Sequence, residues 1–537
     1  MPAATATAAR HSAPARHPRA WLRKTAQWRP TAEQLIVLLL GIFVLVVHDV
    51  GYMISHPYWT DEAWVAVTTR FPLSQLPAVT SSTPIGWSAL VRLVTVPGTQ
   101  TARLLPLAFS AATVVAAYWF ARSLGWRWKA ASVAAGLAAG IGALLVPAML
   151  VRNDLKQYTA EAFTVLVTLT LTSRLEREWS RKRLAALSVS VWAGMLVSDA
   201  VAFVGVAAFV AVCIVQITRR AWRRLAEAVV AGAATGVLML GVYEAFDARA
   251  AAPLNASSYW AHYYLPAAQG LHASVTFVAA HLHDVQSRFG LGPAWLAVPL
   301  IIAGLVTIAR LGRPATAIAV VVLWPVMIVL SALKKYPFLN PRTSTFLFVI
   351  TVVVAAVGII GVCSLMRPWL KGGVAAGLAA CAVAAFVLGA QPYVRSHTIA
   401  NEDVRDQARY VVTHAAADNV IVVNLDSNWG FAYYWPIGQP ARRADTAVRQ
   451  LYEAYFPGQP RIIIARNRNP AAVDAVLAQA LARARHYSCN RIWLIRTHLS
   501  ASEQVAWVAA LRQQGQSSER VGHDGLRVIQ VRGASCR

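Results

Sequence analysis

The sequence predicts an α-helical polytopic membrane protein with about eleven transmembrane helices and a small C-terminal α/β domain. Two observations lead to this prediction. The 537 residues are 57% hydrophobic and only 14% charged, and uncharged apolar stretches recur at lengths near the ~20 residues that a membrane-spanning helix needs. Beyond residue 391 the pattern changes to short β-branched runs that alternate with helical patterns.

The predicted transmembrane part covers residues 31–391. Its spans are residues 33–53, 103–121, 131–150, 159–173, 185–199, 200–217, 225–245, 293–309, 315–333, 344–366 and 373–391. A shorter apolar stretch at residues 83–97 is bracketed by prolines and contains Arg92. We expect this stretch to lie along the membrane surface as an interfacial helix.

Lys and Arg fall in alternate connections, which predicts the orientation. Basic loops are retained on the cytoplasmic side of a membrane. Residues 1–30 carry basic side chains and no acid, and they lack an apolar core before the basic cluster, so we expect a disordered cytoplasmic tail rather than a signal peptide. An odd number of spans then places residues 392–537 outside the plasma (inner) membrane. The net charge of +26 follows mostly from this topology, with some affinity for anionic membrane lipids, and needs no nucleic-acid partner.

Four outer loops precede the C-terminal domain, at residues 54–100, 151–158, 246–292 and 334–343. Asp61 and Glu62 lie side by side in the first of them. The second link, together with the start of the next span, carries Asp154, Lys156, Tyr158 and Glu161 among other polar residues. Ionisable groups at a membrane boundary are costly unless they are paired or hydrated. Each group is therefore either an ordinary wet or interfacial cluster or part of a chemical site.

The fourth outer loop contains Lys335, Tyr336 and Arg342. Cations on the outer side run against the positive-inside bias. They suggest an anionic ligand such as a lipid phosphate, for which Arg342 supplies a forked donor. The alternative is a local exception to a statistical rule.

Residues 392–537 read as a soluble extracytoplasmic α/β domain. The strand-like runs are residues 419–423, 461–464 and 491–495, and helical patterns cover residues 402–415, 470–486 and 501–513. Cys489 and Cys536 are the only cysteines in this domain. They are a candidate disulfide, although Cys536 is equally well interpreted as a free thiol.

Together these features resemble the GT-C superfamily of polytopic glycosyltransferases, in particular the bacterial relatives of protein O-mannosyltransferases and the lipid A aminoarabinose transferase. The resemblance extends over residues 31–345 in order and topology. It rests on Asp61-Glu62, Thr83-Pro84, Lys156-Gln-Tyr158 with Glu161, and Tyr336-Pro-Phe338 with Arg342.

The resemblance implies a hexosyl- or pentosyltransferase of the cell envelope. Its donor would be a sugar on a polyprenyl phosphate, and its acceptor a glycan, lipid or protein on the non-cytoplasmic face. Asp61 would act as a general base or orient the acceptor through a divalent metal, with Glu62 and Glu161 as further catalytic candidates; related proteins more often have Asp at the position of Glu161. The implied substrate-binding residues are Lys156, Tyr158, Lys335, Tyr336 and Arg342.

A non-enzymatic protein is the alternative: a lipid or solute transporter, or an envelope scaffold. Transporters usually show paired halves and ionisable groups near the membrane midplane. Here no matching halves are evident, and the predicted spans are nearly free of acids. The polar candidates gather at one membrane surface instead, which favours interfacial chemistry.

The topology can be tested with reporter fusions. Fusions placed after Ser173, Tyr336 and Arg537 should report inside, outside and outside, because the basic loops alternate only under that arrangement. A cytoplasmic signal from the fusion at Arg537 would contradict the predicted orientation and the proposal that the polar loops lie outside.

Overall fold

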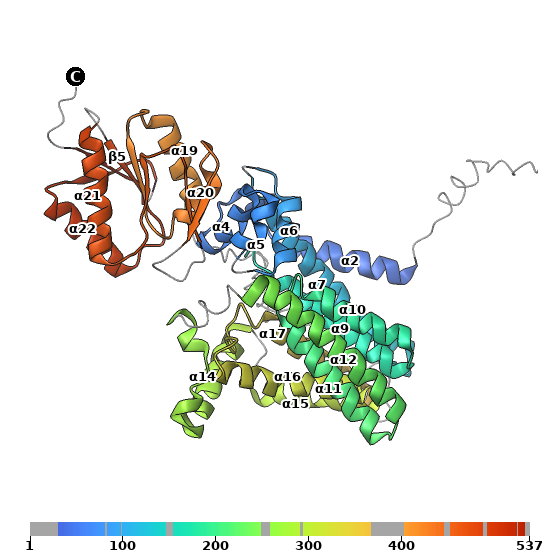
Figure 1. The fold of residues 1–537 in the computed structure, drawn as a ribbon. Coiled ribbons are helices and arrows are strands. Elements are labelled where there is room, and N and C mark those ends of the chain that lie inside the picture. Colours follow the sequence, from blue (N-terminus) through green and yellow to red (C-terminus); the bar gives the residue numbers. More distant parts are fainter. Residues whose placement is uncertain are drawn as a thin grey trace, which may run out of the picture.

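In the described part of the chain, a helical bundle lies between residues 32 and 366, and a sheet covered by helices follows from residue 402 (Figure 1). The computed structural model describes residues 31–80, 83–97, 99–145, 154–248, 258–289, 294–366, 402–444, 452–486, 491–523 and 525–531. The predicted span at residues 373–391 lies outside the described residues, as do Cys489 and Cys536.

Five helices in the described part are long and apolar enough to cross a membrane, as expected of a multi-pass membrane protein. They are the continuous helix Thr101–Ser123 (η3 and α7), α11 (Ala200–Thr218), α12 with its π-helical end (Trp222–Asp247), α16 (Pro314–Ala332) and the segment Thr345–Leu365 of α17 (Thr345–Met366). Other predicted spans contain shorter or less apolar helices. These are α2 (Ala32–Val47), α8 (Lys129–Leu145), α9 (Tyr158–Arg177), α10 (Arg181–Gly194) and α15 (Ala294–Arg310). The count of eleven therefore stays a prediction.

The bundle core forms where α7, α8, α9 and α17 pack together and where α11 packs against α16. By contrast, α12 exposes large apolar side chains such as Val230, Val237 and Leu240. An apolar outer surface is stable where lipid tails replace water, so this face of α12 is suited to contact lipid.

Glycines bring α15 and α17 into close contact. A Cβ atom at Gly304 would overlap the backbone carbonyl of Val354, and one at Gly358 would overlap that of Leu300. Small residues let membrane helices approach until their backbones are in contact. In lipid the hydrophobic effect does not drive helices together, so van der Waals packing at such contacts provides the attraction. These two glycines thus set the distance between the helices.

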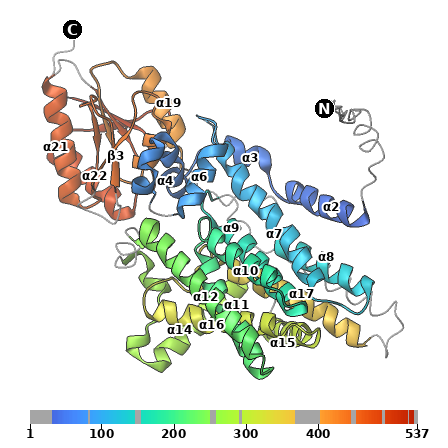
Figure 2. The same cartoon turned by 45° about the vertical axis from the view of Figure 1, so that its right-hand side comes forward.

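Short helices cover one end of the bundle, the end predicted to lie outside, and lie between it and the C-terminal domain (Figures 1 and 2). They are α3 (Val50–Ser55), α4 (Thr60–Ala66), η1 (Val67–Arg70), η2 (Leu73–Gln75), α5 (Leu76–Val79) and α6 (Ile85–Val94). In the predicted interfacial stretch, α6 buries Trp87 and Val91 and exposes Leu93. Farther along the chain, the predicted third outer loop contains η6 (Ser258–Tyr263), η7 (Ala267–Gln269) and α14 (Leu271–Phe289).

A buried ion pair fixes α4. The Arg103 guanidinium donates to both carboxylate oxygens of Glu62, with Nε 2.7 Å from Oε1. It also donates to the carbonyls of Met53, His56 and Pro57 at 2.6, 2.6 and 2.9 Å. Neither charged side chain is exposed. A buried ion pair is tolerated where additional hydrogen bonds satisfy the remaining polar atoms. Here the remaining N–H groups of the arginine are satisfied by backbone carbonyls of the turn that precedes α4.

The C-terminal sheet has the strand order β4-β1-β5-β7-β6. Its strands are β1 (Val420–Val423), β4 (Ile462–Ile464), β5 (Arg491–Ile495), β6 (Ser518–Arg520) and β7 (Arg527–Gln530); β1 is parallel to β4 and β5, and β7 is antiparallel to β5 and β6. A separate antiparallel pair joins β2 (Ala441–Ala444) to β3 (Tyr452–Tyr455).

The two faces of this sheet bury different partners. Val420 and Val422 point toward α21 (Pro470–His486) and α22 (Ala501–Gln513). Ile421 and Val423 belong to the other core, with α19 (Val404–His414) and α20 (Asn428–Tyr434). That second core continues into α4, η1 and α6. The domain and the outer helices therefore share one apolar core.

The glycine contact predicts a specific loss of stability. Gly358→Ala should lower the stability of the protein by about 1–3 kcal/mol, because the methyl group overpacks the contact between α15 and α17. Gly236→Ala on α12 is the matched control, since a Cβ atom there meets nothing within 4 Å. Thermal unfolding in detergent measures both variants. Equal melting temperatures for the two would contradict the assigned helix contact.

Candidate active site

Arg342 joins two carboxylates from distant parts of the chain. It lies in the turn between α16 and α17. Its Nη2 atom donates to Asp61 Oδ2 and to Asp154 Oδ2, at 2.6 Å each. Asp61 is the second residue of α4, and Asp154 lies shortly before α9. The Asn340 side chain accepts from the backbone N–H of Arg342 and Thr343, which shapes the turn that presents the guanidinium.

Aromatic rings hold the cations of this cluster. The Arg342 guanidinium lies over the rings of Trp59 and Tyr158, 5.0 and 5.6 Å from their centroids. The Lys156 ammonium lies 4.8 Å from the centroid of Trp64. Both geometries are within the range of cation–π attraction. The sequence-predicted residues Asp61, Lys156, Tyr158 and Arg342 thus meet at one place.

Burial and the neighbouring charges shift the pKa values of the two carboxylates in opposite directions. Burial opposes ionisation of Asp61, but Lys156 and Arg342 outweigh it, so the pKa of Asp61 lies below its usual value. Burial raises the pKa of Asp154, and the neighbouring Asp61 charge adds to this although Arg342 opposes it. Burial lowers the pKa of Lys156, while Asp61 acts in the opposite direction. Asp61 is therefore the member of the pair that carries the negative charge most readily.

The other predicted residues lie outside this set of bonds. Glu62 points to Arg103, and burial raises the pKa of Glu62 to about 7 against the effect of that arginine. Glu161 is fully buried in the first turn of α9. Tyr336 donates its hydroxyl to the carbonyl of Thr343 at 2.9 Å and so braces the turn that carries Arg342. Lys335 is exposed after the end of α16. Their predicted catalytic and binding roles stay predictions.

Asp154 was not among the catalytic residues expected from the sequence. It stood among other polar residues of the predicted second outer link. Its position between two basic residues at a predicted membrane boundary was the available signal, since an ionisable group there is costly without a partner.

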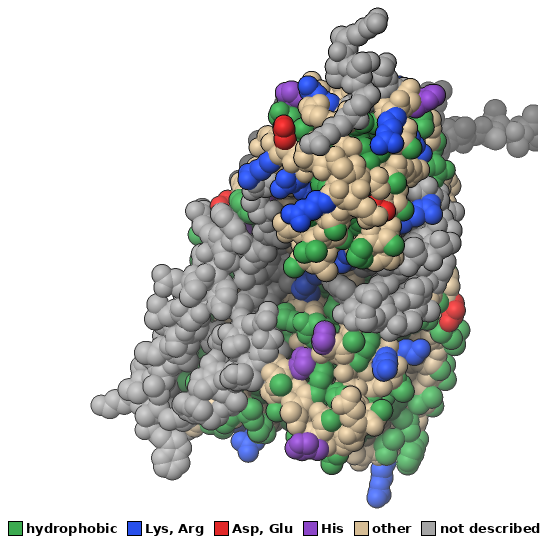
Figure 3. All heavy atoms as spheres, turned by 90° about the vertical axis from the view of Figure 1, so that its left-hand side faces the viewer, with side chains coloured by type: hydrophobic (Ala, Val, Ile, Leu, Met, Phe, Trp, Pro, Cys, Tyr) green, Lys and Arg blue, Asp and Glu red, His purple; other side chains and the backbone are tan. Residues whose placement is uncertain are grey.

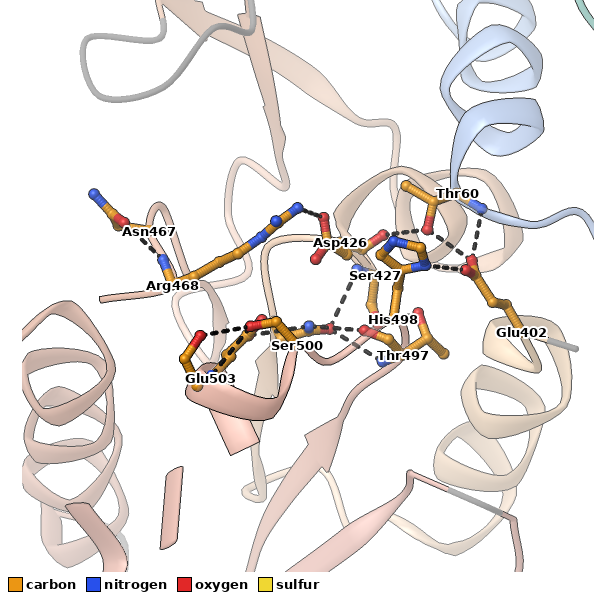
Figure 4. Close-up of polar contacts among 12 residues, drawn as sticks. Thr60, Glu402, Asp426, Ser427, Asn467, Arg468, Thr497, His498, Ser500 and Glu503 are labelled. Atoms are coloured by element: carbon orange, nitrogen blue, oxygen red, sulfur yellow. Dashed lines mark hydrogen bonds and ion pairs between the residues drawn. The ribbon is translucent and has the colours of Figure 1, made fainter. Parts of the chain in front are cut away.

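The C-terminal domain also reaches α4. The Glu402 carboxylate accepts from the backbone N–H and the hydroxyl of Thr60, each at 2.7 Å through Oε2. Its other oxygen, Oε1, lies 2.6 Å from Nδ1 of His498. Figure 4 shows this chain of contacts between the domain and the first residue of α4. A carboxylate at a helix N-terminus satisfies free N–H groups and complements the helix dipole. Glu402 thus caps the helix that carries Asp61.

His498 and Asp426 follow the carboxyl ends of two parallel strands, β5 and β1. Ligand sites in open α/β sheets form at this edge. His498 has a φ of 50°, a left-handed conformation that is uncommon for a residue with a side chain. The hydrogen bond to Glu402 raises the pKa of His498, although partial burial opposes it. No pattern in the sequence indicated these contacts.

The described residues suit a divalent metal poorly. They contain no group of three His, Cys, Asp or Glu side chains that would hold a metal ion. Asp61 and Asp154 do converge, but Nη2 of Arg342 lies between their oxygens. The arginine therefore supplies the positive charge at this position.

No model of a known family matches the sequence, and no curated protein matches it either. Solved structures do match. The apo structure of ArnT from Cupriavidus metallidurans is 13% identical with a TM-score of 0.57, over 93% of this chain and 98% of that one. ArnT from the same organism bound to undecaprenyl phosphate is 13% identical with a TM-score of 0.55, over 97% and 100%. The chain has the GT-C fold. The GT-C match extends along almost the whole chain, and it confirms the fold that the sequence resemblance implied.

The raised pKa of His498 predicts a pH-dependent stability. The bond to Glu402 contributes most below the ordinary histidine pKa, and the contribution is lost as the pH rises through the higher folded value. Thermal unfolding of the wild type and His498→Gln should therefore differ more at pH 5.5 than at pH 9. His272→Gln, on an exposed position of α14, is the control. A difference that stays constant with pH would show that His498 makes no charge-dependent contact.

Proposed function

We propose that this chain is a membrane glycosyltransferase that moves a sugar from a polyprenyl-phosphate donor to a cell-envelope acceptor on the non-cytoplasmic face. The observation that carries the proposal is the meeting of Asp61, Asp154 and Arg342 at one end of the GT-C bundle. An ionised carboxylate beside cations offers a proton acceptor and a partner for a phosphate in the same place.

In the proposed reaction, Asp61 takes the proton from an acceptor hydroxyl. The acceptor oxygen forms a bond to the anomeric carbon as the bond from that carbon to the phosphate oxygen breaks. The electron pair leaves with the polyprenyl phosphate. Attack opposite the leaving group inverts the anomeric centre.

Arg342 and Lys156 stabilise the charge that develops on the leaving phosphate. The Arg342 guanidinium offers a planar fork that suits phosphate oxygens, and Lys156 offers a point charge. Asp154 then balances and orients Arg342, while the rings of Trp59 and Tyr158 restrict its movement.

The donor class is supported by the likeness to ArnT, whose structure holds undecaprenyl phosphate. The other predicted residues take secondary roles. Glu62 and Tyr336 support the loops that carry Asp61 and Arg342, and Lys335 is a candidate for a more peripheral phosphate contact. A panel of hexosyl and pentosyl donors, assayed by release of the lipid phosphate, tests the enzymatic function. A lack of turnover with every donor would favour the transporter or scaffold.

Asp61→Asn should abolish transfer. The amide is nearly isosteric but accepts no proton, and loss of a well-placed general base typically lowers a rate by ~10² to 10⁴. The measurement is turnover of the purified variant with the donor that is active in the panel. Asp474→Asn on α21, which makes the same chemical change away from the site, should leave the rate unchanged. Full turnover by the Asp61 variant would exclude it as the base.

Arg342→Lys should weaken donor binding although the positive charge remains. The lysine loses the fork that reaches two oxygens at once, and a charged hydrogen bond is worth about 1.5–3 kcal/mol. Donor affinity is measured by titration of the lipid-linked sugar. Arg310→Lys, at the exposed end of α15, is the control. If Arg342→Lys and Arg342→Ala bind the donor as the wild type does, the phosphate site lies elsewhere.

A further inference from the structure

A cavity of about 470 Å³ lies in the C-terminal domain. Its wall includes Arg496, Arg520, His498, His523 and Asp403. Four of these five side chains are basic. Figure 3, which views the molecule from the side of this domain, shows basic side chains distributed over its surface.

Arg496 is the unusual member of this wall. It is only 6% exposed. Its backbone is fixed on both sides by Gln407, which accepts from the Arg496 N–H and donates to the Arg496 carbonyl. Its Nε atom donates to the carbonyl of Gly525 at 3.3 Å. In the described part of the chain, no carboxylate forms an ion pair with its guanidinium.

The charge of Arg496 is therefore poorly compensated. Burial lowers the pKa of Arg496 to about 10, and the nearby Arg527 contributes to this. The side chain still carries its charge at neutral pH. A buried charge without an ion-pair partner is costly, and the neighbouring Arg527 increases the cost, while the Glu503 carboxylate offsets part of it. An anion bound in the cavity would remove the imbalance.

Two histidines complete the polar wall. His523 Nδ1 lies 2.9 Å from Asp403, and His498 Nδ1 lies 2.6 Å from Glu402. In both imidazoles a carboxylate contacts Nδ1. At His498 this contact raises the pKa and favours the cationic form, which donates from both nitrogens. The Nε2–H of His498 is then available for an anionic ligand.

We propose that this cavity binds a phosphate or carboxylate group of the acceptor, with Arg496 as the central contact. The link to the acceptor is His498, which lines the cavity and also holds Glu402 against Thr60, next to Asp61. The identity of the ligand as the acceptor rests on the proposed function. Anion binding itself does not.

The test uses the full-length protein in detergent and two simple probes, inorganic phosphate and acetate. Each is titrated against chloride at equal ionic strength, and binding is followed by thermal unfolding. The apparent dissociation constant of the preferred probe should rise about tenfold or more in Arg496→Gln, since a charged hydrogen bond is lost. Arg491→Gln, an exposed position on the same strand β5, removes the same charge and should bind as the wild type does.

Three outcomes would overturn the proposal. They are the absence of any probe-specific stabilisation in the wild type, equal binding by Arg496→Gln, and equal losses in Arg496→Gln and Arg491→Gln. If Arg496→Gln does not fold, Arg520→Gln at the rim takes its place, and unchanged binding by that variant counts against the site. Asp61→Asn should retain probe binding. A failure of the glycosyltransferase assay is thereby distinguished from a failure of the anion site.

Discussion

The buried guanidinium of Arg103 is the contact on which the end of the bundle that carries Asp61 depends. It neutralises Glu62 and satisfies three backbone carbonyls of the turn that leads into α4. Removal of one partner from a buried pair typically costs about 3–5 kcal/mol, because the remaining charge stays buried without compensation. The position of α4, and with it the position of Asp61, therefore follows from a residue at the start of the next membrane helix.

The second support for α4 comes from the C-terminal domain. Glu402 caps the helix at Thr60, and Trp429 of α20 stacks on Trp64 with ring centroids 6.0 Å apart. Together with the shared apolar core, these contacts make the domain part of the site's framework. The bundle holds this short helix through Arg103, and the domain holds it through Glu402 and Trp429. A change in the packing of the bundle against the domain should therefore shift Asp61.

The sequence predicted the parts of the site that depend on topology. Asp61, Lys156, Tyr158 and Arg342 were found because they fall in outer loops, where charged groups require an explanation. The apolar runs predicted as strands contain β1, β4 and β5. These strands could be predicted because buried parallel strands appear in a sequence as continuous β-branched segments. The length and hydropathy expected of a membrane-spanning helix were less informative for α8, α9 and α10, which are shorter or less apolar than the five long apolar helices.

The rest depends on contacts that sequence position does not encode. Glu62 is adjacent to Asp61 in the chain, yet successive residues of a helix point about 100° apart, so one faces Arg103 and the other Arg342. Asp154 pairs with Arg342, which is 188 residues away in the chain, and Glu402 binds Thr60, which is 342 residues away. Pairing of this kind is set by the packed fold and leaves no periodic signal.

The position of Arg342 between two aspartates has a consequence for the catalytic cycle under the proposed function. The resting site already contains its own anions, so an incoming lipid phosphate competes with Asp61 and Asp154 for the same guanidinium. This competition lowers the affinity for the donor. It also releases Asp61 from Arg342 when the phosphate binds the guanidinium, so that Asp61 can accept a proton. After transfer, the return of the carboxylates to Arg342 would displace the spent lipid phosphate and favour product release.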